Sequence, residues 1–145
     1  MIRRATPDDA HAVGDVFVRA RDEMTYLPRI DDEHRPLLGG WFVERDEIWV
    51  ADRDGTVVGF AGVNRDVLTH LYVDPTAQNR GLGTALVERA KQLRPGRLEL
   101  WVFQKNAGAR RFYERHGFRL VRLTDGADNM EKEPDALYEW SPGQP

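Results

Sequence analysis

The chain has 145 residues, which is the length of one domain, because single domains usually run to about 100–200 residues. Its formal net charge is −3, from 21 lysines and arginines against 24 aspartates and glutamates, which argues against broad electrostatic capture of nucleic acid. Cysteine is absent, which excludes a disulfide framework and thiol catalysis, and the four histidines show no spacing suited to a metal. We therefore expect one domain over residues 1–145 that binds neither metal nor nucleic acid.

No apolar run approaches the roughly 20 residues needed to span a bilayer, and the first nine residues lack the apolar core of a signal peptide. We therefore expect a cytoplasmic protein that does not bind membranes. Residues 141–145 are expected to form a frayed end.

The first predicted element is a helix. Thr6 can cap it, Pro7 suits its first position, and Asp9 supplies the acidic partner three residues after the cap. Apolar residues then recur at steps of three and four from Ala10 to Met24, which predicts one buried stripe.

The pattern weakens over residues 26–46. Apolar residues between Leu37 and Phe42 are compatible with a short helix, but Pro36 and the pair Gly39-Gly40 argue against a long one. We interpret this segment as mobile.

Three β-rich runs follow. Residues 48–51 and 56–63 are joined through Asp54-Gly55, a pair that readily takes the positive φ angles of a tight hairpin, so these strands should be antiparallel. A third run covers residues 67–73 and ends before Asp74-Pro75.

The second half alternates helix and strand. A helix from Leu82 to Leu93 precedes a strand over residues 98–103, which predicts that this strand lies parallel to the third run. A last helix ends at Gly117, and strands at 118–123 and 137–140 flank a polar loop. The predicted fold is α/β, with a mixed, mostly antiparallel sheet flanked by helices.

Residues 78–84 enter the helix at Leu82 with two glycines. Backbone N–H groups at a helix start lack internal partners and lie at the positive end of the helix dipole, so they can hold a phosphate. The segment does not match the dinucleotide-binding fingerprint, because Leu86 stands where a glycine is needed. It does not match the phosphate-binding loop of nucleoside triphosphatases either, because no Gly-Lys-Ser/Thr follows. The alternative is a tight turn without a ligand.

Several segments together resemble the GCN5-related N-acetyltransferase superfamily, in order, over about residues 48–123. They are Leu71-Tyr72-Val73-Asp74-Pro75, Gln78-Asn79-Arg80-Gly81-Leu82-Gly83, and Asn106 with Ala109 and Phe112-Tyr113-Glu114 before Gly117-Phe118. The resemblance implies a central parallel strand pair that splays at one end. It also implies acetyl-CoA as cosubstrate, with its pantetheine arm added along the splayed strand like a further strand.

The resemblance assigns cofactor-binding roles along this stretch. The implied residues are Leu71, Tyr72, Val73, Gln78, Asn79, Arg80, Gly81, Leu82, Gly83, Thr84 and Asn106. Asparagine at 106 is equally suited to capping the last helix, and both roles can coexist.

Tyr113 is the implied catalytic residue. A phenol with an unperturbed pKa of about 10 stays protonated at neutral pH and can donate a proton to the departing CoA thiolate. The alternative is one more apolar aromatic beside Phe112.

The base is left open. Many relatives carry a glutamate five residues before the asparagine, where this chain has Trp101. Glu99, His70 or a chain of water molecules could accept the proton from the amine instead. We expect no single side chain to be indispensable.

The predicted function is direct acetyl transfer from acetyl-CoA to a primary amine through a tetrahedral intermediate, without a covalent enzyme intermediate. The alternatives are a longer acyl-CoA as donor, or a non-catalytic acyl-CoA-binding module of the same fold. The acceptor is undetermined, since the segments that usually flank it in this family, residues 26–46 and 123–134, are the least patterned. A homodimer is possible because dimers are common in the family.

Overall fold

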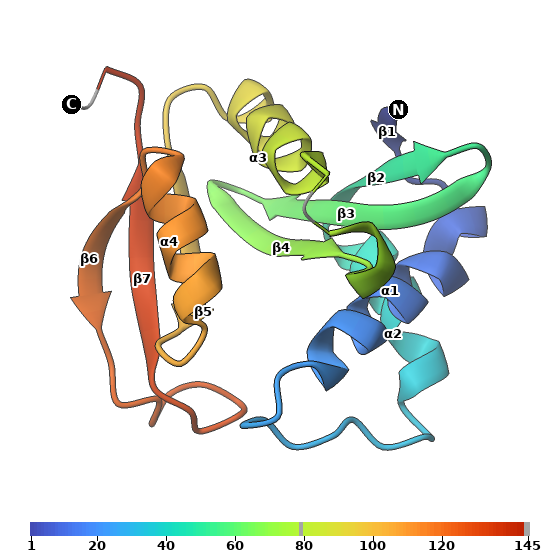
Figure 1. The fold of residues 1–145 in the computed structure, drawn as a ribbon, viewed down its shortest axis with the longest axis horizontal. Helices are drawn as coiled ribbons and strands as arrows, with labels where there is room; N and C mark the ends of the chain where they lie inside the picture. Colours follow the sequence, from blue (N-terminus) through green and yellow to red (C-terminus); the bar gives the residue numbers. More distant parts are fainter. Residues whose placement is uncertain (79, 144–145) are drawn as a thin grey trace.

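The computed structural model describes residues 1–78 and 80–143. These residues form a seven-stranded sheet with the strand order β1-β2-β3-β4-β5-β7-β6 (Figure 1). The strands are β1 (Ile2–Arg4), β2 (Glu47–Arg53), β3 (Thr56–Asn64), β4 (Val67–Val73), β5 (Leu98–Phe103), β6 (Arg119–Leu123) and β7 (Asp135–Trp140). The helices are α1 (Ala10–Asp22), α2 (Leu38–Arg45), α3 (Leu82–Leu93) and α4 (Ala107–Arg115), with short 3-10 turns η1 (Pro7–Asp9), η2 (Arg35–Leu37) and η3 (Pro75–Ala77). The predicted mixed, mostly antiparallel α/β fold is confirmed.

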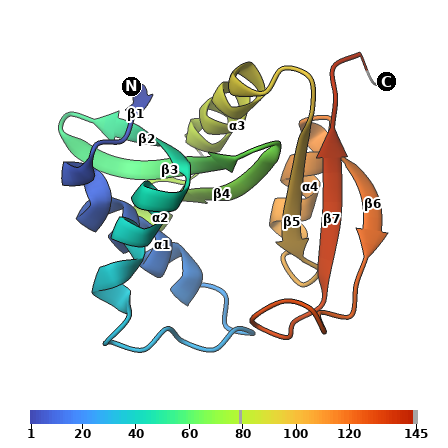
Figure 2. The same cartoon turned by 180° about the vertical axis from the view of Figure 1, so that it is seen from behind.

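The first half of the sheet, β1 to β4, is antiparallel throughout. The predicted hairpin between β2 and β3 turns at Asp54 and Gly55, with φ angles of 53° and 87°. The helices α1 and α2 cover one face of this half and α3 the other, as Figures 1 and 2 show from opposite sides.

Within residues 26–46, interpreted as mobile, the short helix that the sequence left open forms as α2 and contains both glycines. Gly39 faces α1 so closely that a Cβ atom there would lie 1.7 Å from the carbonyl oxygen of Ala10 and 2.8 Å from the amide nitrogen of Gly14. The low helix propensity of glycine is therefore outweighed by the backbone contact that it permits.

The second half of the sheet consists of β5, β7 and β6, with α4 on the same face as α3 (Figure 1). The side chains of Leu98, Leu100 and Val102 are buried in the core beneath these helices. The opposite face of β5 is partly open, and Trp101 is 45% exposed there.

The two halves meet at the parallel pair β4 and β5, and this pair separates almost at once. Its register contains one residue pair, Val67 with Glu99, and the Glu99 amide donates to the Asp66 carbonyl at 2.8 Å. The predicted splay is confirmed. From Leu68 to Val73, the edge of β4 that faces β5 has no strand partner among residues 1–78 and 80–143.

No helix in residues 1–78 and 80–143 is both long enough and apolar enough to cross a membrane.

Candidate active site

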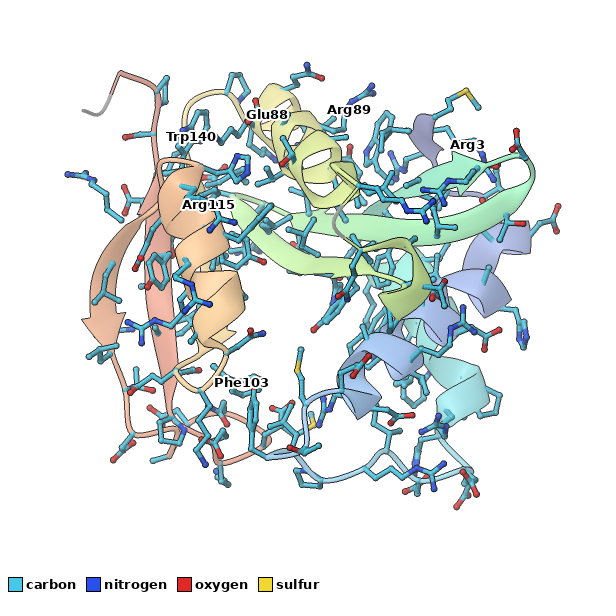
Figure 3. The ribbon with its side chains drawn as sticks, viewed as in Figure 1. Arg3, Glu88, Arg89, Phe103, Arg115 and Trp140 are labelled. Atoms are coloured by element: carbon cyan, nitrogen blue, oxygen red, sulfur yellow. The ribbon has the colours of Figure 1, made fainter. Side chains whose placement is uncertain are left out.

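A cavity of about 880 Å³ fills the opening between β4 and β5. Its α3 end is formed by the start of α3 and by α4, and its loop end by the last turn of α1, the residues after it and the end of β5. Figure 3 shows Arg115 on the side of α3 and Phe103 near the loop end.

Most of the predicted site residues line this cavity. They are Leu71, Tyr72, Val73, Gln78, Gly81, Leu82, Gly83, Thr84, Asn106 and Tyr113. Arg80 is exposed and does not belong to the lining, and Asn79 lies outside the described residues. The three sequence segments that carry the resemblance therefore meet at one opening in space.

The α3 end keeps backbone atoms accessible because of its glycines. Gly81 caps α3 with a φ angle of 79°, a conformation that residues with a Cβ atom rarely adopt. A Cβ atom at Gly83 would lie 3.3 Å from the Phe112 ring of α4, so α3 and α4 approach each other closely there. Gly81 and Gly83 line the cavity and place no side chain of their own over the first amides of α3.

His116 joins α4 to α3 at this end. Its Nε2 lies 3.3 Å from the Thr84 hydroxyl, its ring packs on Phe112, and its carbonyl accepts a hydrogen bond from Lys91 at 2.6 Å. Burial and the neighbouring ammonium of Lys91 lower the pKa of His116. Nothing in the sequence spacing indicated this contact.

The wall formed by β4 contains a β-bulge. Gly62 pairs with His70 and Val63 with Leu68, so Thr69 has no residue opposite it. A bulge leaves the backbone groups of the extra residue unpaired, and Thr69 lines the cavity.

Two tyrosines with strongly desolvated phenols line the cavity, Tyr72 on β4 and Tyr113 on α4. Burial raises the pKa of Tyr72 to about 12. Burial, and next the charge of Tyr72, raise the pKa of Tyr113. No described residue makes a hydrogen bond to the Tyr113 hydroxyl, so at neutral pH it is a protonated donor available to a ligand.

Asn106 caps α4, as its alternative role predicted. Its Oδ1 accepts a hydrogen bond from the Ala109 amide at 3.1 Å. This contact fixes the start of α4 beside the cavity and leaves the side-chain amide group of Asn106 free of that bond.

The candidate bases differ in their positions. Glu99 pairs with Arg97, stands where β4 and β5 are still paired, and does not belong to the cavity lining. His70 does line the cavity, and its Nε2 lies 3.2 Å from Asp46.

Asp46 is a functional candidate that the sequence did not reveal, because it precedes His70 by 24 residues in an unpatterned stretch. Burial acts to raise the pKa of Asp46, but hydrogen bonds from His70, Asn64 and Thr69 outweigh burial and hold it below its usual value. The carboxylate therefore stays ionised and favours a proton on the Nε2 of His70.

Two rim loops, residues 23–34 and 124–134, close the loop end. They lie side by side in Figures 1 and 2. The Arg21 guanidinium, at the end of α1, joins Glu131 at 3.3 Å, and the Lys105 ammonium joins Glu133 at 3.4 Å. Tyr26 lines the cavity, packs edge-on against Phe103, and buries its hydroxyl without a hydrogen-bond partner among the described residues.

Comparison with known proteins agrees with this geometry. Residues 44–120 match a family model described as an acetyltransferase (GNAT) domain. The chain is 36% identical to the peptidyl-lysine N-acetyltransferase YiaC of Escherichia coli (strain K12) over 87 residues, which cover 59% of each protein. The matched regions span 59%, 48% and 35% of the first three curated relatives, so the chain corresponds to part of their length.

Solved structures share the fold over nearly the whole chain. The apo form of YjaB from Escherichia coli matches with a TM-score of 0.79 and 25% identity, covering 97% of this chain and 96% of that one. The PaiA N-acetyltransferase from Thermoplasma acidophilum, solved in complex with coenzyme A, matches with a TM-score of 0.73 and 18% identity, covering 97% and 98%. Since the family model matches more than half of the chain, the protein belongs to the GNAT acetyltransferase family.

Proposed function

We propose that this chain transfers an acetyl group from acetyl-CoA directly to a primary amine. The observation that carries the proposal is that one cavity brings together the glycine-bearing start of α3, the unpartnered edge of β4 and the Tyr113 hydroxyl. The names of the relatives and the coenzyme A in the PaiA structure support it.

The α3 end fits the diphosphate of acetyl-CoA. Amides from Gly81 to Thr84 lie at the positive end of the α3 dipole, and neither glycine carries a side chain that would block them. From there, the pantetheine arm can follow the unpartnered edge of β4 over Leu71, Tyr72 and Val73 and exchange main-chain hydrogen bonds with it. Asn106, Gln78 and Leu82 line the same path.

Acetyl-CoA supplies an activated thioester, and this chain orients it and handles its protons. A backbone N–H group at the Thr69 bulge can polarise the thioester carbonyl, whose oxygen gains negative charge when the amine attacks. Tyr113 then donates to the sulfur as the carbon–sulfur bond breaks. Because a free thiol has a pKa of about 8.5, well below that of this buried phenol, Tyr113 acts chiefly as a strong hydrogen-bond donor while the thiolate forms.

The proton of the attacking ammonium must leave before its lone pair can react. His70, with its Nε2 held by Asp46, retains a lone pair on Nδ1 and is better placed than Glu99 to accept this proton through water. Neighbouring backbone carbonyls share the removal of this proton, so that no single side chain is indispensable.

The acceptor is a primary amine of a small molecule or peptide, and a peptide lysine is the first to test because YiaC is named a peptidyl-lysine N-acetyltransferase. The test is the release of CoA thiol from acetyl-CoA over a panel of amines, with mass spectrometry of the products. Turnover with at least one amine, with acetyl found on nitrogen, is expected.

The second candidate is a non-catalytic acyl-CoA-binding module. Trp101 at the position of the usual glutamate is the observation that favours it. Saturable acetyl-CoA binding without turnover on any amine of the panel would move the assignment to this module.

A further inference from the structure

Negative charge is concentrated on the two rim loops. They carry eight carboxylates and two cations, namely Glu23, Asp31, Asp32, Glu33, Asp125, Asp128, Glu131 and Glu133 with Arg29 and Lys132. Since the whole chain has a net charge of −3, the loops hold −6 and all the remaining residues together hold +3.

Only some of these carboxylates are neutralised within the fold. Glu131 and Glu133 join Arg21 and Lys105, and Asp31 and Asp32 pair inside their own loop. Among the described residues, no ion pair involves the remaining four, which are exposed: Glu23, Glu33, Asp125 and Asp128. Glu23 belongs to the cavity lining.

The opposite end of the cavity has the opposite sign. Arg115 of α4 lines the cavity there, and Lys91 of α3 donates to the His116 carbonyl while it pairs with Glu88 at 3.4 Å. A cation therefore lines the end where the phosphates of acetyl-CoA would bind, whereas the carboxylates of the rim loops stand at the end where the acceptor would enter.

The lining between the two ends suits an alkyl chain. Trp101, Tyr26 and Phe103 place aromatic surface at the loop end of the cavity. Two cations also approach this end, but Lys105 is paired with Glu133, and Arg122 lies 5.5 Å from the centre of the Trp101 ring. Aromatic walls beneath a carboxylate rim match the apolar stem and charged head of a lysine.

We propose that the acceptor is a primary ammonium with further positive charge close to it, as in a lysine flanked by basic residues in a peptide. This inference rests on the proposed acetyl transfer and specifies its substrate class. Carboxylates around the entrance attract such an acceptor, raise its local concentration and repel acidic sequences, and salt screens the effect.

The test uses three synthetic peptides of equal length with one central lysine flanked by arginine, alanine or glutamate, and spermidine as a non-peptide polycation. We expect kcat/KM to be at least about tenfold higher for the arginine-flanked peptide than for the glutamate-flanked one at low salt. Raising the ionic strength from about 0.05 to about 0.5 M should reduce that ratio severalfold. A preference for spermidine over every peptide would overturn the peptide assignment.

A matched pair of variants locates the effect. Glu23→Gln/Glu33→Gln/Asp128→Asn removes three carboxylates from the rim loops and should reduce the ratio between the two charged peptides about fivefold. The control Asp8→Asn/Glu44→Gln/Asp54→Asn removes three exposed carboxylates elsewhere and should leave the ratio unchanged. An equal reduction in both variants would show that overall charge, rather than the rim loops, selects the acceptor.

The outcomes separate this inference from the proposed function. Equal rates with all three peptides, or a preference for the acidic one, would overturn the inference and leave acetyl transfer to amines in place. Absence of turnover with every amine would overturn the proposed function. The inference would then be decided by whether the CoA-bound protein binds the arginine-flanked peptide more tightly than the glutamate-flanked one.

Discussion

The two ends of the cavity differ in the groups that form them, main-chain groups at one end and side chains at the other. The α3 end uses main-chain groups at a helix start and a strand edge, kept accessible by glycines and by the splay of β4 from β5. The loop end uses side chains from segments more than 100 residues apart, joined by contacts such as that between Arg21 and Glu131. A site built from main-chain groups requires particular residue types, such as glycine, at fixed spacing in the sequence. A site built from loop side chains requires no fixed spacing.

The largest expected effect is on acetyl-CoA binding at the α3 end of the cavity. In the native protein, acetyl-CoA at 100 times its Kd should stabilise the fold by about 2.7 kcal/mol through mass action. Gly83→Val should abolish this stabilisation, because the added side chain meets Phe112 and covers the amides at the start of α3. Thermal unfolding with and without acetyl-CoA measures it.

The control for that variant is Gly40→Val, a helical glycine at which a Cβ atom would meet nothing within 4 Å. It should keep the full acetyl-CoA shift. An unchanged melting temperature of the native protein in saturating acetyl-CoA would falsify the binding site itself.

The next effect lies between the two ends, at Tyr113. Tyr113→Phe should lower turnover by roughly tenfold to a thousandfold while acetyl-CoA affinity changes little, because only the donor to the leaving thiolate is lost. Steady-state kinetics on an accepted amine, together with the acetyl-CoA thermal shift, measure both quantities.

Tyr138→Phe is the matched control. Tyr138 is also buried, but its hydroxyl donates to Glu114 at 2.7 Å and it does not line the cavity. This variant should lose about 1 kcal/mol of stability and keep its turnover. Equal losses of turnover in both tyrosine variants would mean that packing, and not chemistry, explains the role of Tyr113.

The sequence predicted the fold well wherever local rules decide it. β4, α3 and β5 begin and end at the predicted residues, because their apolar periodicity agrees with the tertiary structure, and the Asp54-Gly55 turn joins β2 to β3 as predicted. It left α2 open as a short helix within a segment interpreted as mobile, because the close approach of Gly39 to α1 is a tertiary contact that overrides propensity.

The site shows the same division. The predicted cofactor-binding residues and Tyr113 line one cavity, apart from Arg80, which is exposed, and Asn79, which is not described. Asp46 and the contact between His116 and Thr84 had no signal in the sequence, because each joins residues more than 20 positions apart without a periodic pattern.

A smaller effect tests the base. His70→Gln should reduce turnover by about tenfold or less, because water can be rerouted along the bulge carbonyls, and Glu99→Gln should have almost no effect because Glu99 lies outside the cavity lining. The pH profile of kcat/KM for the acceptor should rise toward alkaline values as the amine loses its proton. A loss of a thousandfold in His70→Gln, with the fold and acetyl-CoA binding intact, would instead identify a dedicated base.

The smallest expected effect is at the loop end of the cavity, at Tyr26. The Tyr26 hydroxyl is buried without a described partner, and burial, followed by the nearby Glu133 carboxylate, raises its pKa, so the neutral phenol carries a desolvation cost in the free protein. Tyr26→Phe should therefore leave stability unchanged or increase it by up to about 1 kcal/mol, measured by urea unfolding. If the hydroxyl finds its partner in the bound acceptor, the same variant should raise the KM for the acceptor severalfold with the KM for acetyl-CoA unchanged. A clear loss of stability with an unaltered acceptor KM would place Tyr26 in the structural support of the loop end, and would leave acceptor selection to the charges of the rim loops.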